Sequence, residues 1–511
     1  MKKFTWIVPV VFLAACGGGG AKPQTDQPDQ QKVYNEPHRP QLHFSPKKGW
    51  MNDPNGMVYS NGTYHLFFQH NPDSTVWGPM HWGHATSKDL VHWAEQPIAL
   101  YPDSLGTIFS GSAVVDANNT SGFGKGGQAP LVAIFTHHNP AREKEGRLDI
   151  QTQSLAYSLD EGKTWTKYAG NPVVPNPGIK DFRDPKVSWF KPAKKWIMTL
   201  ATSDHITFYS SPNLKNWKKE SEFGKGIGAH GGVWECPDLF PLDYNGEKVW
   251  VLVVNINPGG PNGGSATQYF TGRFDGSIFT PNQTGTKWLD YGPDEYAGIT
   301  WSNTGDRKIF LGWMSNWQYA NVVPTAKWRS ATTIPKELGI EKSGNNYLVV
   351  SRPVKELDAL AEKSETFSDI TATDYDLTQK TGKLSGPARI IMTADKLEPF
   401  TLTLSNSEGE KLVIGYDRSA NNYFIDRSKA GEVSFEKGFA ARHTAPRFSD
   451  KDPVDITLVI DNASVELFAD GGRTVMTEIF FPHSLFSDIR IQSDNGFKIK
   501  SLQYTPLKSI W

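Results

Sequence analysis

The chain has 511 residues, and its 53 lysines and arginines against 54 aspartates and glutamates leave a formal net charge of −1. So even a balance gives no support for a polyanionic partner such as nucleic acid. The length exceeds the usual size of one domain, so we expect two. Aromatic residues make up 12% of the chain, alongside 47 glycines and 34 prolines. With few helical patterns, this composition favours an all-β protein.

The first residues predict an export signal rather than a folded element. Two lysines precede an apolar run over residues 6–15, which is too short to span a bilayer. The run ends in Leu13-Ala14-Ala15-Cys16, which resembles the lipobox of bacterial lipoproteins. That resemblance implies a lipoprotein signal peptide over residues 1–16, with cleavage before Cys16 and lipid attached to its thiol. A plain secretory signal is the alternative.

Residues 17–36 predict a flexible tether, because they are rich in Gly, Pro and Gln and show no apolar periodicity. No later segment is long and apolar enough to cross a membrane, so we expect attachment through the lipid alone. The protein would be exported to a bacterial membrane, on the periplasmic side of the outer membrane or at the cell surface. Cys236 is the only other cysteine, so an acylated Cys16 leaves no internal disulfide.

From residue 37 to 340, short strand-like runs alternate with turn-forming residues. Asn61-Gly62 between two apolar runs predicts a hairpin. A polar turn closed by an aromatic ring recurs along this region, with the ring at Trp93, Trp165, Trp217 and Phe279. Irregular repetition at about the length of a blade predicts a β-propeller of about five blades. Unrelated hairpins in a large sandwich are the alternative.

The pattern changes after residue 340, where residues 341–373 form the predicted junction. Residues 374–511 keep alternating β patterns, for example at 400–404 and 454–460, while tryptophan vanishes except for Trp511. This stretch predicts a C-terminal β-sandwich.

Three acids stand among turn-forming residues at predicted strand ends. They are Asp53 before Pro54, Asp184 before Pro185, and Glu235 in Glu235-Cys236-Pro237. Taken alone, Asp53 fits an ordinary turn in which its side chain bonds its own backbone. Hydrolysis of a glycosidic bond with retention, however, needs two carboxyl groups close together. A propeller brings the inner strand of every blade to one channel, so acids distant in sequence can meet there.

An ordered series of motifs makes the chain resemble glycoside hydrolase family 32, the invertases, inulinases and levanases. The motifs are His43-Phe44-Ser45-Pro46, Trp50–Gly56, Gln69, Trp77-Gly78, Phe109–Ser112, Arg183-Asp184-Pro185, Glu235–Pro237, Asp290–Ala297 and Gly312-Trp313-Met314. The resemblance implies a five-bladed propeller with the active site in its funnel, followed by a β-sandwich.

The resemblance also implies a role for each acid. Asp53 would be the nucleophile, Glu235 the general acid/base, and Asp184 would stabilise the transition state by holding fructosyl hydroxyls. Glu235 would have to be protonated at the working pH to donate to the leaving oxygen, and would then activate water. We expect Arg183 to keep Asp184 ionised, because an adjacent cation favours the charged carboxylate.

Further residues would hold the sugar. Asn52, Gln69 and Ser110 would donate to hydroxyls, Trp50, Trp77, Phe109 and Trp313 would wall the pocket, and Arg183 and Asp294 would add polar contacts. No cofactor is implied, and the mechanism needs no metal. His81, His84, His137 and His138 lack a compact ligand spacing and are interpreted as structural.

The sequence thus predicts a retaining β-fructofuranosidase that removes fructose from the ends of levan or inulin, and possibly cleaves sucrose. An endo-acting enzyme of the same family is an alternative, depending on whether loops at 105–108, 139–147 and 257–264 block the funnel. Three further alternatives remain: a non-catalytic fructan-binding lipoprotein, an inverting arabinan-type enzyme, and a sialidase, which the Asp-box pattern of residues 158–165 suggests. The motifs choose neither between hydrolysis and transfer to another sugar nor an oligomeric state.

Overall fold

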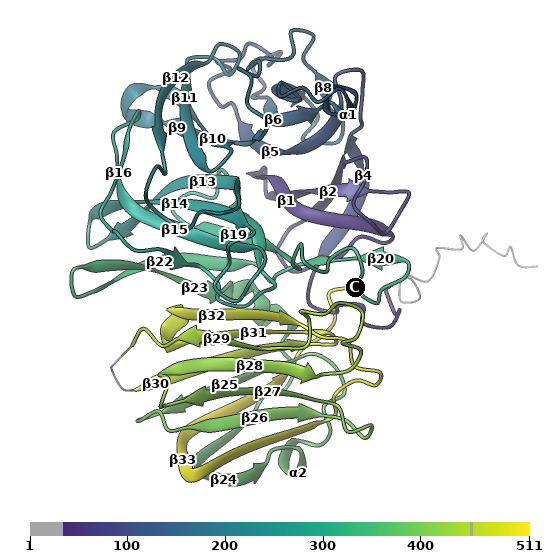
Figure 1. Ribbon diagram of the computed structural model, residues 1–511, viewed down its shortest axis with the longest axis vertical. Coiled ribbons are helices and arrows are strands. Elements are labelled where there is room, and N and C mark those ends of the chain that lie inside the picture. Colours follow the sequence, from purple (N-terminus) through teal and green to yellow (C-terminus); the bar gives the residue numbers. More distant parts are fainter. Residues whose placement is uncertain (1–33, 450–452) are drawn as a thin grey trace, which may run out of the picture.

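A computed structural model describes residues 34–449 and 453–511 of the chain. These residues form a five-bladed β-propeller followed by a β-sandwich, which confirms the predicted all-β architecture (Figure 1). The predicted signal peptide of residues 1–16 with its Cys16, and the predicted tether up to residue 33, lie outside the described residues. Within the part that is described, no helix is long and apolar enough to cross a membrane.

The first three blades are antiparallel sheets that follow one another along the chain. The first contains β1 (Gly49–Ser60), β2 (Thr63–Asn71), β3 (His81–Ser87) and β4 (Trp93–Leu100). The second contains β5 (Thr107–Val115), β6 (Leu131–His138), β7 (Gln151–Ser158) and β8 (Thr166–Lys167), with α1 (Pro140–Lys144) before β7. The third contains β9 (Phe182–Phe190), β10 (Lys195–Thr202), β11 (His205–Ser211) and β12 (Lys218–Phe223), with η2 (Lys191–Ala193) after β9.

The last two blades complete the ring. The fourth contains β13 (Val233–Tyr244), β14 (Glu247–Asn257), β15 (Ala266–Phe274), β16 (Phe279–Pro281) and β17 (Lys287–Trp288). The fifth contains β18 (Tyr296–Thr300), β19 (Lys308–Met314), β21 (Ala331–Thr332), β22 (Lys336–Ser343) and β23 (Asn346–Pro353). Between β19 and β21, β20 (Trp328–Arg329) crosses to the first blade and pairs with β1 in parallel. This pairing ties the last blade to the first.

The predicted repeat corresponds to one turn in each of four blades. The turn joins the third strand to the fourth, and an acid or amide side chain accepts hydrogen bonds from backbone N–H groups two to four residues later. The acceptors are Asp89, Asp160, Asn213 and Asp275. The predicted hairpin at Asn61-Gly62 is also confirmed: both residues have positive φ, as a tight two-residue turn requires.

The sandwich follows η3 (Lys355–Leu360) and is built on one long strand. Its strands are β24 (Glu365–Asp376), β25 (Ala388–Ala394), β26 (Phe400–Ser405), β27 (Lys411–Asp417), β28 (Asn422–Lys429), β29 (Arg442–Pro446), β30 (Val454–Asp461), β31 (Ser464–Ala469), β32 (Thr474–Ile479) and β33 (Asp488–Pro506), with α2 (Thr378–Thr381) and η4 (Asp470–Gly472). The first part of β33 pairs with β26, and its last part pairs with β25. One sheet thereby folds into two layers.

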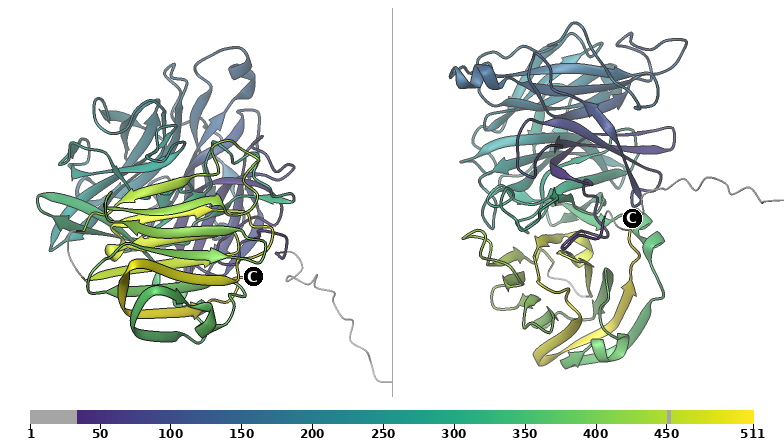
Figure 2. Two further views of the ribbon diagram at one scale, coloured as in Figure 1. Left: turned by 60° about the horizontal axis from the view of Figure 1, so that its bottom comes forward. Right: turned by 90° about the vertical axis from the view of Figure 1, so that its right-hand side faces the viewer.

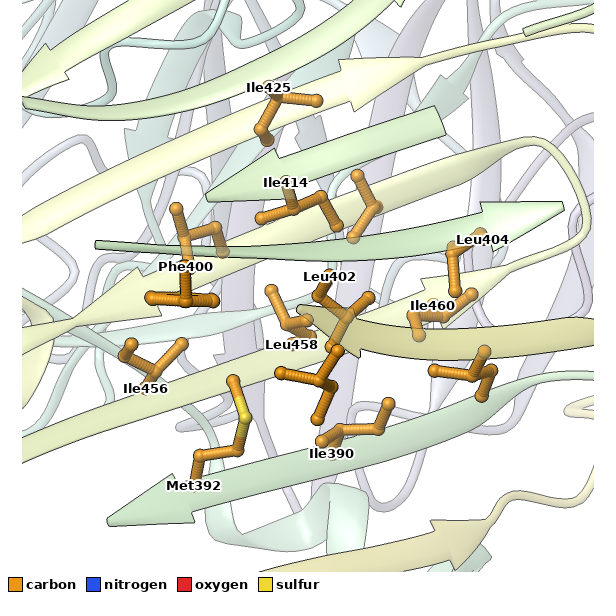
Figure 3. Close-up of a cluster of buried hydrophobic side chains, with 14 of the residues drawn as sticks. Ile390, Met392, Phe400, Leu402, Leu404, Ile414, Ile425, Ile456, Leu458 and Ile460 are labelled. Carbon is orange, nitrogen blue, oxygen red and sulfur yellow. The ribbon is translucent and has the colours of Figure 1, made fainter. Parts of the chain in front are cut away.

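Alternating apolar residues fill the space between these layers, as Figure 3 shows for side chains such as Ile390, Leu402, Ile414 and Leu458. On β25 and β26 every second residue is buried, which is the period expected of strands with one face toward the core.

The sandwich packs against the side of the propeller that carries β22 and β23 (Figures 1 and 2). Buried ion pairs cross this boundary. His43 Nδ1 lies 2.7 Å from Asp461, Lys336 Nζ lies 3.0 Å from Glu466, and Arg427 Nη1 lies 2.6 Å from Asp294. We name the buried charged residues at this boundary the interdomain cluster: His43, Asp290, Asp294, Lys336, Arg427, Asp461, Glu466 and Glu478. Near it, the ring of Tyr34 stacks on that of Trp511, with centroids 3.7 Å apart.

Candidate active site

The first strand of every blade lines the channel, and each contributes a polar side chain near its start. Neighbouring first strands contact one another around the ring, in the order β1, β5, β9, β13 and β18. The residues they bring together at one mouth of the channel are Asp53, Ser110, Asp184, Glu235 and Tyr296. The three predicted acids, separated by 131 and 51 residues in sequence, therefore share one site.

A shift in strand pairing occurs at each of these positions. On the channel strands the register breaks between Met51 and Pro54, between Ile108 and Gly111, between Glu235 and Asp238, and between Tyr296 and Ile299. The third blade shows the same break between Arg183 and Lys186. Bulges turn a side chain away from its regular direction and are common beside active sites. The Asn-Asp-Pro and Arg-Asp-Pro turn motifs are thus interruptions of strands rather than loops.

Left-handed backbone accompanies three of the bulges. Asp184 has φ 63°, Cys236 has φ 41° and Ala297 has φ 54°. Such conformations are strained for residues with a Cβ and cluster at functional sites.

Asp53 is held by neutral donors only. Asn52 Nδ2 donates to Oδ1 at 2.7 Å, and Ser110 Oγ donates to Oδ2 at 2.6 Å. The thiol of Cys236 lies 3.4 Å from the same Oδ2 and 3.7 Å from Asp184 Oδ2. Asp53 and Asp184 therefore lie close enough for one thiol to contact both carboxylates. Among residues 34–449 and 453–511, no lysine, arginine or histidine forms an ion pair with Asp53, and its hydrogen-bond donors are uncharged.

Glu235 has a different setting. Arg183 donates to its Oε1 from Nε at 3.2 Å and from Nη2 at 3.0 Å, and the Tyr296 hydroxyl donates to its Oε2. Burial, with the nearby charge of Glu235, raises the pKa of Tyr296 well above its usual value, so this hydroxyl stays a donor. The side chain of Glu235 remains 20% exposed at the mouth. Its expected protonation stays a prediction.

The expectation that Arg183 keeps Asp184 ionised is wrong. Burial raises the pKa of Asp184 to about 7, and the charges of Glu235 and Asp53 act in the same direction. The Arg183 guanidinium opposes this shift, but its Nε lies 4.0 Å from Asp184 because its donors are directed at Glu235 and Asp181. The backbone N–H of Cys236 is the group that bonds Asp184 directly, at 3.0 Å.

The predicted aromatic walls divide into two kinds. Trp77 is 43% exposed and meets the ring of Phe109 edge-on, with centroids 6.1 Å apart. Trp50 and Trp313 have no exposed surface, and their ring centroids lie 6.0 Å apart. The indole N–H of Trp50 donates to Asn52 Oδ1 at 2.8 Å, so this ring positions the neighbour of Asp53.

Two further groups in this region are buried donors without a partner among the described residues. They are Gln69 Nε2 and Trp313 Nε1. Because buried polar groups are nearly always bonded, each such group needs an explanation. A hydroxyl-binding role for Gln69 is compatible with this geometry.

Asp294 does not belong to the site, and the prediction that it binds a sugar hydroxyl is wrong. Its Oδ1 accepts from the Tyr319 hydroxyl at 2.5 Å, and its Oδ2 accepts from Arg427 at 2.6 Å and from the Ile479 N–H at 2.9 Å. Fully buried at the domain boundary, it has no oxygen left for a sugar. A motif shared along a family marks structural positions as well as functional ones.

Sequence reasoning missed two groups in contact with the acids, Tyr296 and Cys236. Both stand inside motifs that were recognised, but neither was given a role. The predicted fold could have indicated Tyr296, because each of five blades should contribute a residue from its inner strand. The predicted polar residues Asp53, Ser110, Asp184 and Glu235 came from only four of these strands.

The described residues offer one group with metal-ligand geometry. Glu408, Glu410 and His483 each place a ligand atom within 4.8 Å of the others. They lie on the sandwich, away from the three acids, and His483 is already paired with Glu410 at 2.5 Å.

Comparison with known proteins agrees with this geometry. Residues 43–353 match the N-terminal domain of the glycosyl hydrolases family 32, and residues 356–506 match the family's C-terminal domain. The chain belongs to glycoside hydrolase family 32. It is therefore a glycoside hydrolase, and the recognised motif series is confirmed as a family relationship.

Family 32 relatives match over nearly the whole chain. A levanase of Bacillus subtilis is 48% identical over 493 residues, covering 94% of this chain and 72% of the levanase. An extracellular exo-inulinase of Aspergillus niger is 41% identical, covering 91% of this chain and 93% of the inulinase.

Solved structures show the same arrangement. An exo-inulinase of Aspergillus awamori superposes with a TM-score of 0.85 at 38% identity, covering 94% of this chain and all of that one. A fructofuranosidase variant of Schwanniomyces occidentalis, complexed with fructosylnystose, gives a TM-score of 0.84 at 35% identity, covering 94% of this chain and 98% of that one.

Proposed function

We propose that this family 32 enzyme is a fructan β-fructosidase, which hydrolyses the β-fructosidic bonds of levan or inulin from the chain end and releases fructose. Sucrose, which presents the same fructosyl unit, would be a smaller substrate. The observation that carries the proposal is the pairing of two differently held carboxyl groups, Asp53 with neutral donors and Glu235 with a cation and a phenol. Relatives that are named levanase and exo-inulinase support the substrate class and the exo mode.

In this mechanism Asp53 attacks the anomeric carbon of the terminal fructosyl unit. The bond to the leaving oxygen breaks, and Glu235 gives its proton to that oxygen. A water molecule then loses a proton to Glu235 and attacks the same carbon, which releases Asp53 and fructose with net retention. Two donors, Asn52 and Ser110, keep Asp53 oriented throughout.

The remaining residues would bind and orient the fructosyl unit. Burial raises the pKa of Asp184, and its carboxyl group can accept from sugar hydroxyls when ionised and donate to them when protonated. Gln69 would add a donor, and Trp77 and Phe109 would form the apolar wall that faces the open side. Trp50 and Trp313 are fully buried, and Trp50 would position Asn52 beside the sugar.

The alternatives make different demands. An inverting enzyme holds its two carboxyl groups farther apart than a retaining enzyme does and releases the opposite anomer, so the stereochemistry of the first product distinguishes the two. A sialidase needs a cluster of arginines and a tyrosine nucleophile, and Arg183 here serves Glu235. A fructan-binding protein without activity would be expected to lack one of the acids, and all three are present.

The proposal extends to location and chain organisation. The relatives include an extracellular enzyme, which supports export. We propose a lipoprotein signal over residues 1–16 with lipid on Cys16, a tether over 17–36, a catalytic propeller over 37–340, a junction over 341–373 and a sandwich over 374–511. A lipid anchor and tether would hold a polymer-degrading enzyme at a bacterial membrane.

A time course of products from levan, inulin and sucrose, resolved by chain length, tests the proposal. We expect free fructose as the only early product from levan and inulin, and equal amounts of fructose and glucose from sucrose. An early ladder of oligosaccharides would make the enzyme endo-acting, and folded protein that releases nothing would favour the binding function.

A further inference from the structure

Exposed apolar side chains gather around the mouth of the propeller channel. Of eight large apolar side chains that are exposed within residues 34–449 and 453–511, six lie in the loops at this mouth: Val76, Trp77, Tyr101, Leu105, Leu148 and Val322. Pairing of Asn71 with Trp50 places the first of these loops at the same strand ends as the acids. Gathered apolar side chains on a surface commonly mark a binding site.

Two aromatic pairs give this region an order. Trp77 meets Phe109 edge-on with ring centroids 6.1 Å apart, and His81 meets Tyr101 edge-on at 5.5 Å. We name these four rings the aromatic strip. Its outer member, Tyr101, is 55% exposed, the largest exposed fraction among those eight apolar side chains.

Hydrogen bonds join the segments that carry the two pairs. The Ile108 N–H donates to the Met80 carbonyl, and the Trp82 indole donates to the Phe109 carbonyl, both at 3.0 Å. The residues on either side of His81 are therefore fixed against the strand that carries Phe109. The two ring pairs are therefore carried by segments that are hydrogen-bonded to each other, in the first and second blades.

The inner end of the strip begins at the acids. Phe109 precedes Ser110, whose hydroxyl lies 2.6 Å from Asp53 Oδ2. From there the strip leads outward to Tyr101, which is held from behind because Lys167 Nζ donates to its carbonyl and to Asp103, both at 2.5 Å. Burial lowers the pKa of His81, so its ring is neutral near pH 7 and adds no charge to the strip.

We propose that the aromatic strip binds the part of a fructan chain beyond the scissile bond, with Tyr101 stacking on a fructosyl unit that sucrose is too short to supply. This inference rests on the proposed function. It specifies the side of the funnel along which the bound polymer extends away from the acids. Aromatic rings offer flat apolar faces to the C–H groups of a sugar while hydroxyls stay hydrated. Ser110, which follows Phe109, bonds Asp53, so the inner end of the strip lies beside the acids, and this position favours the substrate chain over a protein partner as its occupant.

Kinetics of Tyr101→Ala on inulin, levan and sucrose test this. Loss of one stacked ring predicts a two- to tenfold lower kcat/KM on at least one polymer, about the energy of one aromatic contact, expressed mainly in KM. Sucrose turnover should stay unchanged. Tyr101→Phe keeps the ring and should retain the polymer rate.

Ile278→Ala is the matched control, because Ile278 is 54% exposed and lies in the turn between β15 and β16, at the blade end opposite Glu235. It should change none of the three rates. An equal loss on sucrose would give Tyr101 a structural role, and unchanged rates on both polymers would exclude chain binding; either result overturns the inference. A wild-type protein inactive on all three substrates would instead overturn the proposed function, and the inference with it.

Discussion

The active site and the interdomain cluster both bury several carboxylates, but they treat the charge in opposite ways. At the domain boundary, Lys336 lies between Asp290 and Glu466, and Arg427 lies between Asp294 and Glu478, so each cation serves two acids. At the mouth of the channel one guanidinium, that of Arg183, bonds Glu235 and lies 4.0 Å from Asp184, while Asp53 receives none of its hydrogen bonds.

One acid from each group, Glu466 and Asp184, illustrates this difference. Burial alone would raise the pKa of Glu466, but the charge of Lys336 and the hydrogen bond from His43 lower it to about 2. Asp184 keeps a raised pKa of about 7 because burial, with the charges of Glu235 and Asp53, outweighs the opposing charge of Arg183. Its raised pKa costs stability as the pH rises from about 4 to about 7, since the unfolded carboxyl ionises first. Acids paired with Lys336 and Arg427 thus link the two domains. The acids of the active site have less compensating charge around them.

The largest expected effect comes from removing the charge of Asp53. Asp53→Asn should lower kcat on sucrose and levan by at least about 10³-fold, because the amide cannot form the covalent intermediate. The melting temperature should hardly change, since Asn52 and Ser110 can still bond the side chain. Asp306→Asn, at an exposed acid, is the control for the same chemical change. Near-normal turnover by the folded Asp53 variant would remove the proposed nucleophile.

Breaking the interdomain cluster should instead cost stability. Arg427→Met leaves Asp294 and Glu478 buried without their cation, a change that costs about 3–5 kcal/mol in other buried pairs. Denaturant unfolding should show this loss. Arg490→Ala removes an exposed pair with Asp374 and should cost no more than about 1 kcal/mol. Equal losses in the two variants would mean that burial of the cluster does not matter.

The pH dependence of stability should show the contribution of the buried His43 ion pairs. Burial would lower its pKa, but the hydrogen bonds that its ring donates to Asp461 and Glu466 outweigh burial and raise the pKa to about 9. Since the folded pKa is above the unfolded value of about 6.5, the contribution of His43 is complete below pH 6.5 and is lost as the pH rises through 9. The loss should reach about 3 kcal/mol at most. Thermal unfolding of His43→Asn from pH 6 to 10 should show a flatter profile; a profile parallel to that of the wild type would contradict the assignment.

The smallest effect should come from a positioning group. Tyr296→Phe removes the hydroxyl that donates to Glu235 and should lower kcat about tenfold with little change in KM, because Glu235 loses one of its two orienting contacts. A rise in KM at constant kcat would place Tyr296 in substrate binding instead.

Motifs and repeats predicted the propeller, the sandwich and the meeting of three acids. They could do so because turns such as Asn61-Gly62, and the turn that Asp89 stabilises, depend on residues adjacent in sequence. Partners across long distances could not be predicted. Asp294 shares a motif with Tyr296, yet one side chain points into the domain boundary and the other toward Glu235. Arg183 precedes Asp184 but serves Glu235, because a bulge turns neighbouring side chains apart.

The retaining double displacement at Asp53 is the central claim, and trapping the fructosyl unit with methanol tests it most directly. Hydrolysis of sucrose or levan in the presence of methanol should yield methyl β-fructofuranoside, an anomer that does not interconvert and can be identified by NMR. Asp53→Asn should form none. Methyl α-fructofuranoside as the transfer product of the wild-type enzyme would contradict the account.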